Sequence, residues 1–159
     1  MIKHYTKEQA LQKIKQYCAY QERSHFDTKE KLYSFGLFKV DVETILSALI
    51  EEDYLNEERF ATLFAGGHFR TKKWGRIKIN AALQQKRVSS YNIRKGLKVI
   101  EESAYRKCLL QLATVKWKSV KTEQWMNRMA KTTHYLLQKG YEANLIQEAL
   151  AQIRSKENE

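Results

Sequence analysis

The sequence has no proline, six glycines and two cysteines among its 159 residues. Since proline and glycine supply most tight turns, a chain this poor in both does not break into many short strands. Long stretches of leucine, lysine, glutamine, glutamate and alanine favour helix instead. The composition therefore predicts an all-α protein.

The two cysteines, Cys18 and Cys108, lie far apart, and neither belongs to a CxxC pair. A disulfide framework is therefore not expected, which fits a reducing cytoplasm. Residues 1–8 contain no apolar stretch of the kind that secretory signals have. No apolar run reaches the roughly 18 residues needed to span a bilayer, so we expect a cytoplasmic protein without a membrane segment.

Acidic residues are absent from the middle of the chain. Residues 59–100 contain eleven lysines and arginines and no aspartate or glutamate. The whole chain has 29 basic and 18 acidic residues, so this acid-free segment holds its entire formal excess of +11. Such a local excess indicates a polyanion or an acidic protein groove as the partner. A well-solvated basic face without any partner is the structural alternative.

Residue patterns that carry catalysis or bind metals are also missing. The four histidines are scattered, without the helical spacing of a metal site, and no phosphate-binding loop is present. One acidic cluster could hold a hard cation, but its glutamates at 57 and 58 fit better as the first turn of a helix that Asn56 caps. We therefore expect no enzyme, no catalytic residue, no metal and no cofactor.

The apolar residues form a repeat with a period of 51 to 53 residues. Relative to Gly36, Arg87 and Gly140, apolar residues fall at −4, +1, +6, +10 and +13 in each copy. Glycine suits the left-handed position that ends a helix, and the last three positions form one face of the next helix. The pattern predicts a helix, a turn and a second helix three times. Three unrelated amphipathic hairpins that agree by chance are the alternative.

A further helical stretch precedes each of these pairs. These stretches are 7–20, 57–69 and 104–118, and the helix that follows the last of them is expected at 123–139. Predicted helix starts are a capping box at Thr6, and N-caps at Asp41 and at Ser89 or Ser90. We expect three three-helix repeats at 1–53, 54–101 and 102–159, the last with a frayed polar tail from Ser155. Since each repeat is too small to bury its apolar face alone, we expect an elongated, curved solenoid.

The acid-free segment supplies the candidate contact residues. Residues 70–78 alone contain five cations and one indole. Lysine and arginine reach phosphates or carboxylates, whereas Trp74 either stacks on a base or, as we rather expect, fixes its loop against the middle helix. The predicted residues that bind a partner or nucleic acid are Arg70, Lys72, Lys73, Trp74, Arg76, Lys78, Lys86, Arg87, Arg94, Lys95 and Lys98.

Several stretches resemble the RecX family, the modulators of the RecA recombinase. Residues 17–24 (YCAYQERS), which lead into 30–36, resemble the first repeat of the family. Residues 54–61 (YLNEERFA) are similar to the acidic motif that opens its second repeat, and residues 74–79 (WGRIKI) to the basic turn that follows. Two departures occur: Asn56 and Glu57 stand where the family has paired aspartates, and Arg87 where it has a glycine.

The resemblance implies a helical repeat protein that lies in the groove of the RecA–DNA filament and bridges neighbouring protomers. It would block strand exchange and filament growth, and lower ATP hydrolysis and co-protease activity, so it would regulate DNA repair, recombination and the SOS response. We expect a monomer that contacts single- or double-stranded DNA weakly, because few aromatic residues interleave the cations of the acid-free segment. A general, salt-sensitive DNA- or RNA-binding helical module is the alternative.

Overall fold

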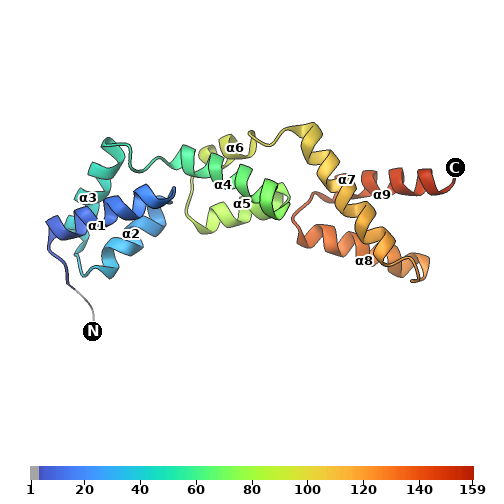
Figure 1. Ribbon diagram of the computed structural model, residues 1–159, viewed down its shortest axis with the longest axis horizontal. Coiled ribbons are helices and arrows are strands. Elements are labelled where there is room, and N and C mark those ends of the chain that lie inside the picture. Colours follow the sequence, from blue (N-terminus) through green and yellow to red (C-terminus); the bar gives the residue numbers. More distant parts are fainter. Residues whose placement is uncertain (1–3) are drawn as a thin grey trace. The chain divides into compact units, whose positions relative to one another are not determined.

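The computed structural model describes residues 4–159, which form helices joined by short turns (Figure 1). No strand occurs within this range, so the all-α prediction is confirmed for it. The helices are α1 (Lys7–Tyr20), α2 (His25–Ser34), α3 (Lys39–Glu51), α4 (Glu57–Lys72), α5 (Arg76–Gln85), α6 (Ser90–Leu97), α7 (Glu102–Ser119), α8 (Trp125–Gln138) and α9 (Ala143–Glu157). None of them is both long and apolar enough to cross a membrane.

Side-chain caps fix most of the predicted helix starts. At α1, Thr6 and Gln9 form the complete capping box. Before α4, the backbone N–H of Arg59 donates to the side-chain oxygen of Asn56 at 2.9 Å. Before α6, Ser89 accepts from the backbone N–H of Asn92 at 3.2 Å. These local hydrogen bonds satisfy N–H groups that have no partner inside the helix, which is why the sequence predicts them well.

Two predictions about helix ends are wrong. Helix α3 begins at Lys39 after Phe38, which makes no side-chain cap, so Asp41 lies in the first turn and is not the N-cap. Its carboxylate still lies where it interacts favourably with the helix dipole. Helix α9 continues to Glu157, so the chain does not fray from Ser155. The side chain of Glu157 accepts a hydrogen bond of 2.7 Å from the indole N–H of Trp117, which holds this last turn.

The three aligned turn positions share one backbone conformation. Gly36, Arg87 and Gly140 have φ values of 86°, 61° and 96°. The N–H of the residue after Arg87 reaches back to the carbonyl of Leu83 at 3.2 Å, and the corresponding bond from Tyr141 joins Leu136. Arg87 therefore makes the turn that glycine makes elsewhere, at the steric cost of a non-glycine residue in the left-handed region. The predicted alignment of the repeats is confirmed at these turns.

The chain forms two compact units. Unit 1 consists of the residues up to 64 and 82–96, and unit 2 of residues 65–81 and 97–159. Residues 65–81 of unit 2 lie in the sequence between the two parts of unit 1. Both ends of this stretch fall inside helices, so α4 and α5 each contribute to both units. The predicted repeat boundaries fall between α3 and α4 and between α6 and α7, and they remain a prediction, as does the curved, elongated stacking.

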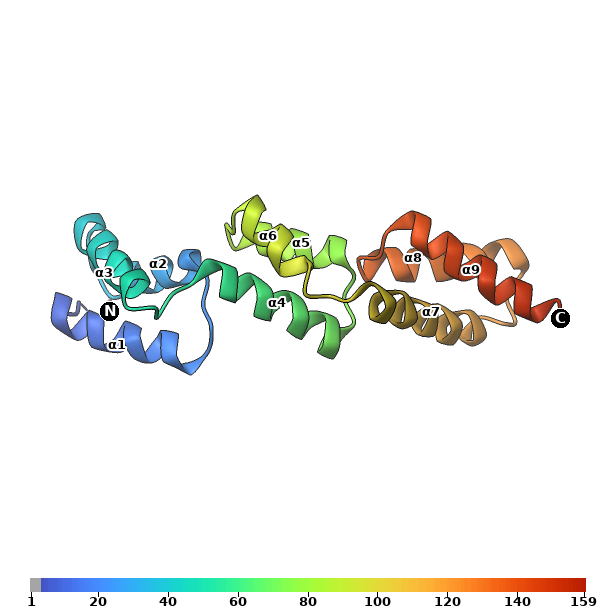
Figure 2. The same ribbon diagram turned by 90° about the horizontal axis from the view of Figure 1, so that it is seen from above.

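Each unit has its own apolar core. In unit 1, α1, α2 and α3 pack on one another. The buried residues of that cluster are Ala10, Ile14, Cys18, Leu32, Phe35, Val42, Ile45, Leu49 and Leu55. In unit 2, α7, α8 and α9 lie side by side (Figure 2). Their buried residues include Tyr105, Leu109, Trp117, Leu136, Tyr141, Ile146, Leu150 and Ile153.

Candidate partner and nucleic-acid interface

The predicted contact residues are distributed over both units. Residues 70–78 and Lys98 belong to unit 2, whereas Lys86, Arg87, Arg94 and Lys95 belong to unit 1. In unit 2 they occupy the end of α4, the turn at 73–75 and the start of α5, and Lys98 directly follows α6. In unit 1 they occupy the α5–α6 turn and α6.

The turn between α4 and α5 is fastened to the turn between α8 and α9. The N–H of Gly75 donates to the carbonyl of Lys139 at 2.7 Å, and the N–H of Ile77 donates to the carbonyl of Gly140 at 2.9 Å. The two backbones approach so closely that a Cβ on Gly75 would collide with the backbone of Gly140. Glycine is therefore required in this basic turn because of a contact with a segment more than 60 residues away.

Side chains hold the carbonyl groups of the same turn. The hydroxyl of Tyr141 donates to the carbonyl of Lys73 at 2.8 Å, and the amine of Lys139 donates to the carbonyl of Lys72 at 3.2 Å. The side chains of Lys72 and Lys73 are themselves exposed. The backbone of the turn is thus fixed while its cationic side chains remain in solvent.

Trp74 is half-buried and packs within its own unit. Its ring centroid lies 4.7 Å from that of His68 on α4. The amines of Lys72 and Lys78 lie 5.3 and 4.7 Å from the indole centroid. These contacts favour the structural role expected of the indole, in which it fixes the turn to the helices on either side, over a role in stacking on a base.

Arg76 is occupied inside unit 2. Its guanidinium forms ion pairs with Glu142 at 2.7 Å and with Glu102, and it lies 3.8 Å from the ring centroid of Tyr105. The backbone N–H of Arg76 also donates to the Tyr105 hydroxyl at 3.0 Å, and that hydroxyl donates to Glu142. Arg76 therefore joins the start of α5 to α7 and to the residue before α9.

The phenols beside this network are kept neutral by their surroundings. Burial, and then the hydrogen bond to Glu142, raises the pKa of Tyr105 well above its ordinary value of 10.0. Burial, and then the neighbouring Cys108, raises the pKa of Tyr141 in the same direction. On the exposed side, hydrogen bonds from Arg106 and the charge of Arg76 lower the pKa of Glu102.

In unit 1, two of the predicted cations are also engaged in ion pairs. Lys86 pairs with Asp27 at 2.7 Å, and Lys95 pairs with Glu58 at 3.5 Å. Other predicted cations are exposed and pair with no carboxylate of residues 4–159. They are Arg70, Lys72, Lys73, Arg87, Arg94 and Lys98.

The sequence reasoning missed three cations of unit 1. Lys13, Arg23 and Lys31 pair with no described carboxylate and lie over aromatic rings instead. Residues 1–58 contain eight lysines and arginines and eleven acids, so a charge count of this part of the chain does not reveal them. The signal that was available is the spacing of lysine and tyrosine along one side of the first helix.

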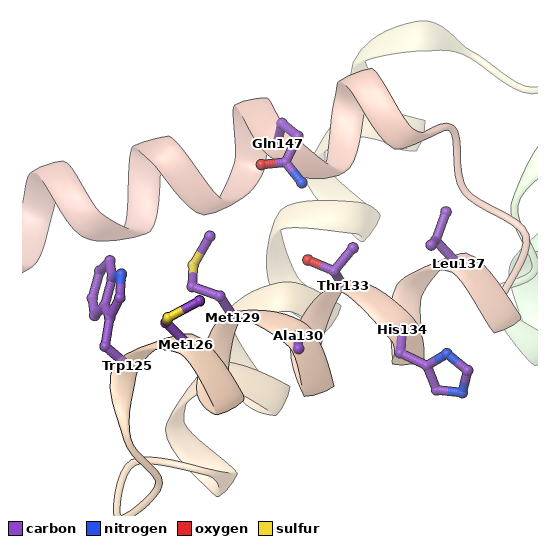
Figure 3. Close-up of a pocket in the computed structure, with 8 residues that line it drawn as sticks. All are labelled: Trp125, Met126, Met129, Ala130, Thr133, His134, Leu137 and Gln147. Carbon is purple, nitrogen blue, oxygen red and sulfur yellow. The ribbon is translucent and has the colours of Figure 1, made fainter.

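An apolar pocket of about 520 Å³ lies along α8 and faces α9 (Figure 3). Its lining residues are Trp125, Met126, Met129, Ala130, Thr133, His134, Leu137 and Gln147. His134 is the one histidine among them, and its ring points away from α9 (Figure 3). Residues 4–159 also contain no group of three or more side chains suited to hold a metal ion. The pocket lining thus lacks the converging acid and base groups of a reaction centre.

Comparison with known protein families identifies the chain. The model of the second three-helix domain of RecX matches residues 56–97, and the model of the third matches residues 105–150. Together they match more than half of the chain. The chain belongs to the RecX family. All the predicted contact residues except Lys98 lie within its second RecX domain.

Curated relatives carry the name regulatory protein RecX. The chain is 30% identical to that of Clostridium tetani over 122 residues, which cover 76% of this chain and 54% of the relative. It is 27% identical to that of Lactobacillus gasseri over 124 residues, which cover 73% of this chain and 46% of the relative. The chain therefore spans about half the length of the curated relatives that it matches.

Solved structures of RecX proteins have the same fold. The crystal structure of RecX from Lactobacillus salivarius matches with a TM-score of 0.85 at 19% identity, covering 93% of this chain and 96% of that chain. A second crystal structure, of a regulatory protein RecX, matches with a TM-score of 0.81 at 21% identity, covering 89% and 71%. At these identities the likeness shows the fold alone, and it confirms the predicted helical repeat.

Proposed function

We propose that this chain is a regulatory protein without catalytic chemistry, which binds the RecA–DNA filament in its groove and across neighbouring protomers. Bound there as a monomer in the cytoplasm, it inhibits recombinase, ATPase and co-protease activities and so regulates DNA repair, recombination and the SOS response. Membership in the RecX family supports this proposal, as does the name regulatory protein that its curated relatives carry. A protein that binds one filament state more tightly than another shifts the population without any chemistry of its own.

One observation carries the proposal. Six cations of the acid-free segment are exposed and make no ion pair within residues 4–159, although the chain has carboxylates elsewhere. A lysine already paired with a carboxylate has to lose that partner before it binds another anion, whereas these six lose none. On the α4–α5 turn, the hydrogen bonds from Tyr141 and Lys139 hold the backbone. Less conformational entropy is then lost when the turn binds a partner.

The direct test follows ATP hydrolysis by RecA on single-stranded DNA while the purified chain is added. We expect hydrolysis to slow at stoichiometric amounts of the chain. A triple variant, Arg70→Ala with Lys72→Ala and Lys73→Ala, should inhibit less while keeping its helix content by circular dichroism. Arg76 stays unchanged in this variant because it holds α5 through two ion pairs.

The matched control removes three exposed lysines of unit 2 that lie outside the acid-free segment and make no ion pair with described residues: Lys107, Lys118 and Lys121. Both triple variants lose the same charge, so a difference between them reports position and not net charge. Failure of the unchanged chain to slow hydrolysis would contradict the proposed function. An equal loss of inhibition in the two triple variants would contradict the role of the acid-free segment.

The second candidate function, general binding of DNA or RNA, rests on the same exposed cations. Contacts of lysine and arginine to phosphate give affinity that does not depend on sequence and that falls steeply with salt. Titrations of labelled single-stranded and duplex DNA at two salt concentrations measure this affinity. If the chain binds free DNA more tightly than it binds the RecA filament at the same salt concentration, this second function replaces the first.

A further inference from the structure

Unit 1 carries a group of cations on α1 and α2 whose partners are aromatic rings. The amine of Lys13 lies 4.9 Å from the ring centroid of Tyr5. The guanidinium carbon of Arg23 lies 3.8 Å from the ring centroid of Tyr17, and the amine of Lys31 lies 5.7 Å from the same ring. None of the three cations pairs with a carboxylate of the described residues, so all keep their charge available.

The helical period of α1 gathers these residues. Lys13, Tyr17 and Tyr20 stand at positions i, i+4 and i+7 of the helix and therefore share one side of it. Glu8, the one acid in α1, lies on the opposite half of the helix. The side that carries the tyrosines is thus free of negative charge along the length of the helix.

Arg23 is held in place before any partner arrives. Its Nε donates to the backbone carbonyl of Tyr17 at 2.9 Å, and its guanidinium stacks on the Tyr17 ring. The same guanidinium carbon is 5.9 Å from the ring centroid of Tyr20, whose side chain is 84% exposed. A fixed guanidinium, whose terminal N–H groups donate to no described residue, therefore lies beside an exposed aromatic ring.

The contacts continue from this end of α1 toward its start. Lys31 lies 5.7 Å from the Phe35 ring as well as from the Tyr17 ring, and Phe35 packs edge-on against Tyr5 with 5.2 Å between centroids. Lys13 then lies over Tyr5. Rings and cations are interleaved along this path. We call Tyr5, Lys13, Tyr17, Tyr20, Arg23 and Lys31 the cation–aromatic row.

Interleaved rings and cations have the chemistry that recognises an unpaired nucleic-acid strand. Proteins bind single strands by combining cations for the phosphates with aromatic rings and arginines on which bases stack. In a duplex the base faces are covered, so exposed rings contribute little there. We propose that the cation–aromatic row binds single-stranded nucleic acid, with a base stacked on Tyr20 beside Arg23 and phosphates at Lys13 and Lys31.

The row differs from the acid-free segment in one physical respect. In residues 59–100 the cations of unit 2 surround a single indole, Trp74, which is half-buried and already packed on His68. The unit 2 part of that segment offers charge with little surface for stacking, whereas the row offers both. The proposal goes beyond RecA inhibition, because single-strand binding by the row is measured with nucleic acid alone, in the absence of RecA.

The test measures fluorescence anisotropy of a labelled oligothymidylate and of a duplex with the full chain. Stacking on an aromatic residue predicts that Tyr20→Ala binds the single strand roughly 5- to 150-fold more weakly. Duplex affinity should stay within about twofold of the unchanged chain. Tyr20→Phe keeps the ring and should restore single-strand binding. Phe38→Ala, at an aromatic residue that is 83% exposed in the same unit, is the matched control and should change neither affinity.

The phosphate contacts predict a salt effect. Removing both Lys13 and Lys31 should lower the slope of log affinity against log salt for the single strand by about 1.4, since each contact contributes roughly 0.7. Lys29→Ala, at a lysine of α2 that makes no ion pair with described residues, is the control and should leave that slope unchanged.

A second readout locates the strand directly. Ultraviolet crosslinking of a strand that contains 5-iodouracil should place an adduct on Tyr20 or Tyr17. The proposal is overturned if Tyr20→Ala leaves single-strand affinity unchanged, if it weakens duplex binding equally, or if every adduct maps outside the row. If Tyr20→Ala leaves single-strand affinity unchanged while removal of Lys13 and Lys31 still lowers the salt slope, the result would point to a protein as the partner of this surface.

Discussion

Replacing Gly140 by alanine should destabilise the protein more than the same change at Gly36. The two glycines occupy equivalent turns and have similar φ values of 96° and 86°. In either place an alanine has to adopt the left-handed region, which costs about 1–2 kcal/mol. The two sites differ in what the new Cβ meets.

At Gly36 the three atoms nearest to the new Cβ belong to the ring of His4, an exposed side chain that can move aside. At Gly140 it would collide with the backbone of Lys78 in α5, so one of two backbone segments has to shift. That shift disrupts the hydrogen bonds that Gly75 and Ile77 donate to the α8–α9 turn, and each contributes about 0.5–1.5 kcal/mol. We therefore expect a loss of about 1–2 kcal/mol for Gly36→Ala and about 2–5 kcal/mol for Gly140→Ala.

Urea unfolding followed by circular dichroism measures the free energy of unfolding of each variant against the unchanged chain. Amide hydrogen exchange, resolved by peptide, then reports the two units separately, since each glycine lies in a different unit. Gly140→Ala should speed exchange around the α4–α5 turn as well as at its own turn. Equal losses at the two glycines, with unchanged exchange in residues 73–77, would refute the close approach of these two backbones.

Two further predictions concern the core and the buried phenols. Leu83→Ala removes a fully buried side chain and should lower the free energy of unfolding by about 2–5 kcal/mol, whereas Leu97→Ala, at a half-buried position, should lower it less. Urea unfolding of both variants tests the assigned repeat register. A negligible loss for Leu83→Ala would contradict that register. Because burial raises the pKa of Tyr105 and Tyr141 above 10.0, the stability that their neutral phenols contribute is complete below pH 10 and is lost as the pH rises further. Above pH 10, the melting temperature should therefore fall less steeply with pH in the Tyr105→Phe, Tyr141→Phe double variant than in the unchanged chain. Identical falls in melting temperature would contradict this assignment.

Much of the secondary structure could be predicted from the sequence, because its determinants are local. The capping box at Thr6 and the caps at Asn56 and Ser89 lie within three residues of the N–H groups that they bind. The error at Asp41 shows the limit of such patterns. An acidic residue fits the first turn as well as the cap position, and only the backbone distinguishes the two.

The candidate site could be predicted only in part. The sequence located the acid-free segment, but not which of its cations are already paired. Arg76 and Lys86 find their carboxylates at Glu142 and Asp27, which lie 66 and 59 positions away along the chain. Neither partner belongs to the segment whose charge was counted, so no count within that segment could reveal the pairing.

The sequence by itself determined the helices, their apolar faces and the left-handed turns that repeat along the chain, because caps, periodicity and turn residues act between near neighbours. Only the tertiary structure decided which charges remain available to a partner. An ion pair depends on the distance between two groups in space, and folding brings acids from distant segments to Arg76 and Lys86. The same folding places Lys13, Arg23 and Lys31 over aromatic rings in a region that has more acids than bases.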